Sequence, residues 1–326
     1  TSIGLAAAGT GNIASFTATN ATATVQTATI TVTPTYTNGG TTCTGTAITF
    51  TITVNPTPSV NVIANQTVCN GTSTTAVTIT GPVAGTVYSW TNNNTNIGLA
   101  ASGTATVPSF TAINTGSTPQ TATITVTSSF TNGGITCTGG STTFTITVNP
   151  TATVNQPAGQ VLCNGANTSA VVFSGLPPGS TYNWTNNNTS IGLAAAGTGN
   201  IASFTATNNT NTVQTATITV TPSASGCGGT AVSFTITVNP TPAVNAIANQ
   251  ALCAGATTAA VTISGPVANT VYTWTNNNTT IGLGAGGIGN VPAFVTVNPT
   301  INPVTATITV TPTYTNGGVS CTGNPV

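Results

Sequence analysis

Short segments of the chain alternate strictly between apolar side chains and threonine. In "TATITVT" at residues 121–127, Ala122, Ile124 and Val126 point to one side of an extended backbone, and the four threonines point to the other. "TTFTITVNP" at 142–150 alternates in the same way. A period of two over short segments bounded by glycine, proline and asparagine is typical of antiparallel strands with one buried face. The pattern therefore predicts an all-β fold.

Three more segments between residues 57 and 150 read as strands. Segment 86–92 places Tyr88 and Trp90 on one face, which predicts that both side chains belong to the core. Segment 74–80 alternates, with its apolar residues on one face, and segment 107–113 contributes Phe110. This stretch of about 90 residues therefore has enough strands for a β-sandwich, a fold of about 100 residues.

The same set of strands recurs along the chain. "TATITVT" occurs four times, at 27–33, 121–127, 215–221 and 305–311. The tryptophans follow at steps of 94 and 90 residues, and the shorter step arises where "TSSFTNGGITC" becomes "TPSASGC". Repetition at this period predicts tandem sandwich domains rather than a solenoid. The expected core aromatics are Trp90, Trp184, Trp274, Tyr88, Tyr182 and Tyr272.

Proline-containing linkers mark the boundaries of the repeats. "NPTP" at 55–58 and 239–242 and "NPTA" at 149–152 read as short, stiff connections, because proline restricts both itself and the residue before it. We expect tandem antiparallel β-sandwich domains in an elongated array. The predicted division is 1–56 as the C-terminal part of a repeat, 57–150 and 151–240 as complete repeats, and 241–326 as a repeat lacking its last strand.

Several motifs together resemble a known class of repeat. "VCNGTST", "YSWTNNN", "IGLAASGT", "TATITVT" and "FTITVNPTP" are similar to the PKD-like, immunoglobulin-like tandem repeats of secreted and surface proteins in Bacteroidota. The resemblance covers essentially the whole chain. It implies β-sandwich modules in long extracellular chains with adhesive or structural roles. It also implies a core position for the tryptophans and oxidation of the paired cysteines.

Seven cysteines occupy two fixed positions in the repeat. The early cysteines are Cys69, Cys163 and Cys253, and the late cysteines are Cys43, Cys137, Cys227 and Cys321. Fixed cysteine spacing in an extracellular chain favours disulfides. Three connectivities are open: within a repeat, as in Cys69–Cys137; across a linker, as in Cys43–Cys69; or from the early cysteine of one repeat to the late cysteine of the next, as in Cys69–Cys227.

We expect the pairing within a repeat, because each repeat should fold alone and a disulfide limits the Cα separation to about 7 Å. That pairing would join Cys69–Cys137, Cys163–Cys227 and Cys253–Cys321, leaving Cys43 without a partner. In a standard sandwich the early and late cysteine positions of one repeat lie at opposite ends, which argues against this pairing.

Charged residues are absent: the chain of 326 residues has no Lys, Arg, Asp, Glu or His. General acid–base catalysis and activated nucleophiles need such groups, so we expect no catalytic residue and no enzyme activity. We also expect no metal site, no cofactor and no nucleic-acid partner, because these need carboxylate, imidazole or basic side chains. No apolar run approaches the ~20 residues of a membrane span.

The neutral surface points to association with further copies of the chain. In natural sheets, charged side chains on the edge strands prevent pairing with other chains. These strands have no charges, which favours side-by-side or end-to-end assembly. We expect an extracellular or cell-surface location and a structural subunit of a filament or surface fibre. The alternatives are stalk or binding repeats of an adhesin and, less favoured because sandwich sheets twist, ice binding by outward threonine rows. Covalent glycans would hydrate such a surface, with candidate sites at Asn20, Asn65, Asn70, Asn93, Asn187 and Asn277.

Overall fold

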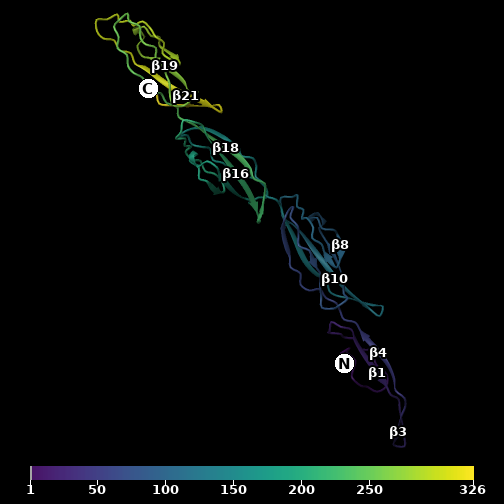
Figure 1. Ribbon diagram of the computed structural model, residues 1–326. Coiled ribbons are helices and arrows are strands. Elements are labelled where there is room, and N and C mark those ends of the chain that lie inside the picture. Colours follow the sequence, from purple (N-terminus) through teal and green to yellow (C-terminus); the bar gives the residue numbers. More distant parts are fainter. Residues whose placement is uncertain (1) are drawn as a thin grey trace. The chain divides into compact units, whose positions relative to one another are not determined.

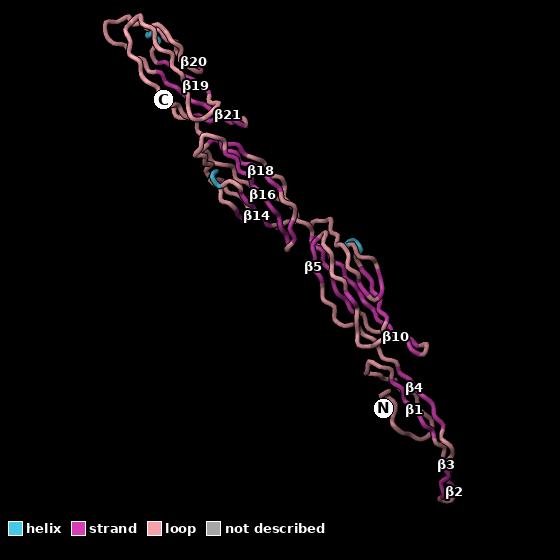
Figure 2. The backbone as a smooth tube through the Cα atoms, viewed as in Figure 1, coloured by secondary structure: helices cyan, strands magenta, loops and turns pink. Residues whose placement is uncertain are grey.

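The computed structural model describes residues 2–326 and is built from strands, with only three single-turn 3₁₀ helices in that range. The described chain divides into two compact units. The first contains the residues up to Thr151 together with Ser225–Cys227, and the second contains Ala152–Ala224 and Gly228–Val326. The all-β prediction is confirmed (Figures 1 and 2).

In the first unit, the stretch 57–150 is organised around one six-stranded sheet. Its order is β5-β12-β10-β7-β8, and β11 pairs with an extension of β10. The strands are β5 (Gln66–Cys69), β7 (Val87–Asn92), β8 (Ser102–Thr104), β10 (Gln120–Asn132), β11 (Ile135–Thr138) and β12 (Thr142–Asn149). The central strand β10 contains the second copy of "TATITVT", and its alternation puts one face of the sheet into the core.

The facing layer of this stretch is made largely of irregular backbone. It contains one short pair, β6 (Val77–Thr78) with β9 (Thr106–Val107), and an isolated bridge between Ser73 and Thr111. The strands predicted over 74–80 and 107–113 are therefore shorter than the sequence suggests. Their apolar side chains still pack inward, since Ile79 and Val107 are buried against β10 and β12.

The residues before 57 form two separate pairs of strands. β1 (Gln26–Val32) pairs with β4 (Ile48–Val54), and β2 (Thr35–Asn38) pairs with β3 (Thr41–Thr44) to form the β2–β3 hairpin. β1 and β4 keep the register of β10 and β12, with Ile30 opposite Phe50 as Ile124 is opposite Phe144. Their apolar face is more open, and Phe50 is 44% exposed where Phe144 is 2% exposed.

The second unit contains two further sheets. The first has the order β13-β18-β16-β14-β15 with β17 on β16, and the second has the order β20-β19-β21-β22. The strands of the first are β13 (Gln160–Cys163), β14 (Thr181–Asn186), β15 (Ala196–Thr198), β16 (Gln214–Ala224), β17 (Cys227–Gly228) and β18 (Val232–Asn239). Cys227, the first residue of β17, is counted with the first unit. Those of the second are β19 (Val271–Asn276), β20 (Gly286–Ile288), β21 (Ile308–Asn316) and β22 (Val319–Thr322).

One strand pairing differs from the antiparallel expectation in the same way in both six-stranded sheets. β5 runs parallel to β12, and β13 runs parallel to β18. In register, Cys69 lies beside Asn149, and Cys163 lies beside Asn239. The early cysteine and the linker asparagine that ends the last strand are therefore neighbours at one end of each sheet.

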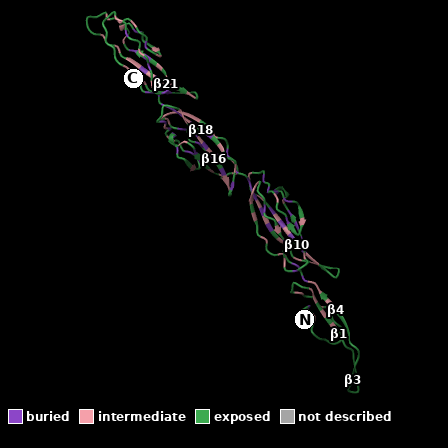
Figure 3. Ribbon diagram, in the orientation of Figure 1, coloured by how far each residue is buried: buried purple, intermediate pink, exposed green. Residues whose placement is uncertain are grey.

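The cores lie between each sheet and its facing layer. The core of 57–150 centres on Trp90, Ile124 and Ile146, and the core of 151–240 centres on Trp184, Ile218 and Ile236. The core of 241–326 is smaller: Trp274 and Val310 are buried, but Ile308 is only partly buried. Figure 3 shows this distribution, with buried residues concentrated along the central strands.

The repeated "NNN" shapes the loop after each tryptophan strand. In the first copy, Asn92 is buried and donates from Nδ2 to the carbonyls of Leu99 and Ala100, while Asn93 Oδ1 accepts from the amide of Thr123. Asn94 caps the 3₁₀ helix η1 (Thr95–Ile97), and Gly98 ends it with a φ of 97°. The helices η2 (Thr189–Ile191) and η3 (Thr279–Ile281) repeat this arrangement.

Candidate functional site

Two disulfides join cysteines that are far apart in the sequence. Cys69 bonds to Cys227 within the first unit, and Cys163 bonds to Cys321 within the second. Both pairs are separated by 158 residues, and both have a Cα–Cα distance of 5.5 Å. The expectation of disulfides is confirmed for these four cysteines. Each bond joins the early cysteine of one repeat to the late cysteine of the next.

The pairing that we expected within a repeat is wrong, and the strand register explains why. Cys69 lies beside Asn149 at the end of β12, whereas Cys137 precedes the first residue of that strand, Thr142. A strand of eight residues is about 23 Å long, and this exceeds the Cα separation of about 7 Å that a disulfide spans. The early and late cysteines of one repeat therefore lie at opposite ends of its sheet.

Three cysteines remain as thiols among the described residues. Cys43 and Cys253 are exposed, and Cys137 is partly buried. The cross-linker pairing that was left open, such as Cys43–Cys69, does not form either, because Cys69 bonds elsewhere.

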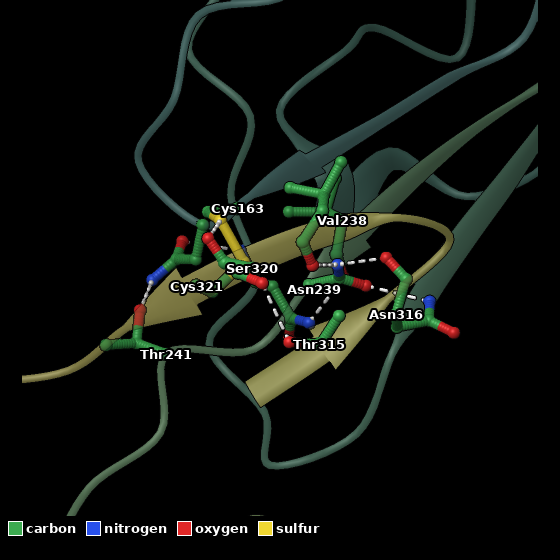
Figure 4. Close-up of a disulfide and its surroundings, with 11 residues drawn as sticks. Cys163, Val238, Asn239, Thr241, Thr315, Asn316, Ser320 and Cys321 are labelled. Carbon is green, nitrogen blue, oxygen red and sulfur yellow. Dashed lines mark hydrogen bonds between the residues drawn. A yellow bond between two sulfur atoms is a disulfide. The ribbon is translucent and has the colours of Figure 1, made fainter. Parts of the chain in front are cut away.

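A buried asparagine accompanies the second disulfide. Asn239 is fully buried and donates from Nδ2 to the carbonyl of Asn316 at 3.1 Å and to that of Val319 at 3.5 Å. Asn316 Nδ2 donates in return to Asn239 Oδ1 at 2.9 Å. Figure 4 shows both side chains next to the Cys163–Cys321 bond. One end of the β13–β18 pair thus holds the β21–β22 hairpin by a covalent bond and by amide hydrogen bonds.

The equivalent asparagines make this contact on an exposed surface or make only part of it. Asn55 Nδ2 donates to the carbonyls of Asn132 at 3.0 Å and of Ile135 at 3.4 Å, and Asn132 Nδ2 donates to Asn55 Oδ1 at 2.9 Å, all on an exposed surface. The side chain of Asn149 makes one hydrogen bond, to the carbonyl of Ser225 at 3.2 Å. The loop between β16 and β17 is shortened and has no asparagine equivalent to Asn132 or Asn316 that could bond in return. We call Asn55, Asn149 and Asn239 the linker asparagines. Sequence reasoning missed their role, although the recurring "VNP" and "TNGG" were visible.

The aromatic residues singled out in the sequence lie in the cores. Trp90, Trp184 and Trp274 are 3%, 7% and 6% exposed. Tyr88 is buried, and Tyr182 and Tyr272 are partly buried against the same clusters. A glycine faces each indole, and a Cβ atom on Gly197 would come within 2.3 Å of the Trp184 ring. None of these aromatic side chains is placed to contact a ligand.

The candidate glycosylation sites fall into two groups. The Nδ2 atoms of Asn20 and Asn70 are engaged: Asn20 donates to the carbonyls of Thr24 and Val54, and Asn70 donates to Thr151 Oγ1. The exposed sites are Asn65, Asn93, Asn187 and Asn277, whose Oδ1 atoms accept backbone amides. Their Nδ2 atoms, where a glycan would attach, have no hydrogen-bond partner in the described structure.

The chemistry of the described residues is limited to thiols, hydroxyls and amides. Residues 2–326 contain no group of three or more metal-ligating His, Cys, Asp or Glu side chains. The search of those residues for a helix that is long and apolar enough to cross a membrane also finds none. Among these groups, the cysteines and the linker asparagines make contacts that recur with the repeat.

Comparison with known proteins gives one family match. The PKD-like domain family matches residues 160–242, from the start of β13 to just beyond β18. Among solved structures, mouse cadherin-23 EC22–24 is similar at 12% identity, covering 82% of this chain and 96% of that chain with a TM-score of 0.39. Sidekick-1 immunoglobulin domains 1–5 are similar at 11% identity, covering 90% and 74%, with a TM-score of 0.28. No curated protein matches the chain in sequence.

These observations define the class of protein. The chain consists of tandem immunoglobulin-like β-sandwich repeats, and residues 160–242 are similar to a PKD-like domain. The two disulfides are consistent with an extracellular location, because such bonds persist in oxidising compartments.

Proposed function

We propose that the chain is a structural subunit of an extracellular filament or surface fibre, assembled with further copies of itself. One observation carries the proposal: the same contact, an early cysteine bonded to the late cysteine of the next repeat, is built twice along the chain. A covalent contact that recurs with the repeat strengthens the connections between repeats. Connections of that kind suit a protein that bears load.

The uncharged strand edges support assembly. The chain has no charged side chain, so no charge opposes pairing between the strand edges of neighbouring copies. Exposed, uncharged edges promote association between chains.

The proposal includes the parts of the sequence-based interpretation that are finer than the class. The division at 1–56, 57–150, 151–240 and 241–326 describes the repeats as folding units. The subunit has no enzymatic activity and no cofactor, since it lacks the acids and bases of catalysis. It is secreted by a bacterium of the Bacteroidota and has glycans on exposed asparagines.

Electron microscopy of the native material at neutral pH and in about 1 M salt tests this function. Salt at that concentration screens ion pairs, and this assembly has none to lose. Ordered filaments with a repeat of one or a few sandwich domains would establish the structural role. Isolated, flexible chains would refute it and would favour the stalk of an adhesin.

The alternative is that the chain forms the stalk or the binding repeats of a cell-surface adhesin. A screen of glycan binding by the chain separates this role from assembly.

Ice binding is the minor alternative. Threonine hydroxyls on neighbouring strands bond to each other, as Thr121 and Thr147 do at 3.0 Å and Thr215 and Thr237 do at 3.2 Å. Hydroxyls that satisfy one another have less capacity to order water, and twisted sheets are poor flat templates. Thermal hysteresis measured in a solution of the chain would support ice binding, and its absence would exclude it.

A further inference from the structure

The two disulfides interlace along the chain. Cys163 lies inside the loop that the Cys69–Cys227 bond closes, and Cys227 lies inside the loop that the Cys163–Cys321 bond closes. Each bond joins cysteines 158 residues apart and passes over two other cysteines, as Cys69–Cys227 does over Cys137 and Cys163. We call these two bonds the interlaced disulfides.

Consecutive cysteines compete for the same bonds through much shorter loops. At each linker a late cysteine is followed 26 residues later by an early cysteine: Cys43 and Cys69 (69 − 43 = 26), Cys137 and Cys163 (163 − 137 = 26), and Cys227 and Cys253 (253 − 227 = 26). Loop closure becomes less probable as about the 3/2 power of loop length, so an unfolded chain closes the 26-residue loop about 15-fold more often than the 158-residue loop. We call these three pairs the linker pairs. Each uses one cysteine of an interlaced disulfide and therefore blocks that disulfide.

The direction of synthesis favours the linker pairs further. When Cys163 has been made, Cys137 is already present, whereas Cys321 follows only after another 158 residues. Chains are made from the N-terminal end, and their domains fold in that order. A chain that meets an oxidant before it has folded therefore joins Cys137 to Cys163 first.

The cores of the repeats do not include the disulfides. The core of 57–150 takes its side chains from residues 60–148, and the core of 151–240 takes its side chains from residues 154–238. Among the described residues, none of the three core clusters contains a cysteine. Each core is therefore built from one repeat alone and can form while the thiols are reduced.

The folded repeats bring the correct thiols together. β13 places Cys163 beside Asn239, and Asn239 exchanges amide hydrogen bonds with Asn316 of the β21–β22 hairpin, which contains Cys321. The Cα atoms of the two cysteines are 5.5 Å apart, inside the limit of about 7 Å for a disulfide. Strand register therefore selects Cys321 for Cys163, although Cys137 is much closer in sequence.

We propose that a thiol–disulfide isomerase acts on this chain and removes the linker pairs, so that the folded repeats can form the interlaced disulfides. The partner is defined by its chemistry: an enzyme with a reactive thiolate that exchanges existing disulfides. Isomerisation is then the reaction that comes between oxidation of the chain and its final fold. The inference concerns how the chain matures and does not rest on a role in a filament.

The exchange balances without an oxidant or a reductant. The isomerase thiolate attacks the Cys137–Cys163 bond at the Cys163 sulfur, which gives a mixed disulfide and releases Cys137 as a thiolate. The thiolate of Cys321 then attacks the mixed disulfide at Cys163, the Cys163–Cys321 bond forms, and the isomerase thiolate leaves. One S–S bond breaks and one forms, and the proton from Cys321 ends on Cys137.

Oxidation of the 326-residue chain before and after folding tests the proposal. One sample is reduced, oxidised by air in denaturant, and moved to native buffer with or without reduced protein disulfide isomerase. A second sample is refolded with its thiols reduced and is oxidised afterwards. Linked peptides are identified by mass spectrometry after cleavage at aromatic residues, since the chain has no trypsin sites.

Two matched variants separate competition by linker pairs from a general difficulty in folding. In Cys137→Ser the other linker pairs leave Cys163 and Cys321 as the remaining thiols, so this interlaced bond should form even in denaturant. In Cys253→Ser the pair Cys137–Cys163 remains, so the same bond should still require the isomerase. Each variant lacks one thiol that is unbonded in the folded chain.

The parent chain oxidised in denaturant should contain linker pairs in about 15-fold excess over interlaced disulfides. In native buffer the interlaced disulfides should return on the order of hours without the isomerase, the timescale of uncatalysed rearrangement, and on the order of minutes with it. The chain that was folded first should form them without the enzyme. Equal rates with and without the isomerase, few linker pairs in denaturant, no interlaced bonds in the chain folded first, or the same behaviour in both variants would each overturn the inference.

Discussion

Replacing the linker asparagines one at a time should give a graded loss of stability at three equivalent sites. The change Asn239→Ala removes a fully buried amide that donates to two carbonyls and accepts from Asn316. A lost hydrogen bond reduces stability by about 1 kcal/mol, and a buried partner left unpaired adds about 1–3 kcal/mol. We therefore expect Asn239→Ala to destabilise the β21–β22 hairpin by about 2–4 kcal/mol.

The other two sites are internal controls. Asn149→Ala removes one hydrogen bond of 3.2 Å, so its expected effect is about 1 kcal/mol. Asn55→Ala removes contacts on an exposed surface, where water replaces the lost partner, and its expected effect is about 0.5 kcal/mol. The three substitutions are chemically identical, so the differences report the surroundings of each amide.

Amide hydrogen exchange, followed by mass spectrometry, measures the effect locally. Each variant is compared with the parent chain in the hairpin that its asparagine contacts, because exchange reports the free energy of local opening. Asn239→Ala should speed exchange in β21–β22 by about 30- to 700-fold, since about 1.4 kcal/mol corresponds to a factor of ten. If its ratio is no larger than that of Asn55→Ala, the burial argument is wrong.

Three further outcomes are expected. The free energy of unfolding should stay constant between about pH 2 and 8, apart from effects of the chain termini, because folded and unfolded chains bind the same number of protons. An acid transition in denaturant melts would contradict this. Gly197→Ala should cost about 1–3 kcal/mol in thermal unfolding through its clash with Trp184, whereas Gly140→Ala, in open space, should cost far less; equal losses would reject the clash. Peptide mapping of native material should find glycan on Asn93 and none on Asn20, whose Nδ2 is engaged; modified Asn20 would count against the assignment.

The strands were predictable from sequence because their signal is local. The alternation in 121–127 and 142–150 fixes which face of β10 and β12 is buried, and those side chains are fully or nearly fully buried. The layer over 74–80 was less predictable. Val77 and Ile79 alternate like a strand and pack against the core, but only Val77–Thr78 forms a strand.

The disulfide pairing was only partly predictable. Cys69–Cys227 was one of three open connectivities, and the opposite ends of a sandwich argued against pairing within a repeat, but the choice depends on a parallel strand pair. Nothing local in "QTVC" at 66–69 shows that β5 runs parallel to β12, which places Cys69 beside Asn149. If all strands are assumed to be antiparallel, the end of the sheet at which Cys69 lies is not determined. The linker asparagine is a similar case: "VNP" reads as a boundary, and its side chain acts on a hairpin 77 residues further along the chain.

The overlap of the two disulfides has a mechanical consequence. The first spans Cys69 to Cys227 and the second Cys163 to Cys321, so residues 163–227 lie inside both loops. The shortest covalent path from Cys69 to Cys321 crosses the first bond, runs backwards along 64 residues to Cys163, and crosses the second. A pulled chain would reach about 220 Å over this stretch, against about 860 Å for the 252 residues without the bonds. Tension therefore passes through the covalent bonds, and most of the repeat sequence is shielded from extension until a disulfide is reduced.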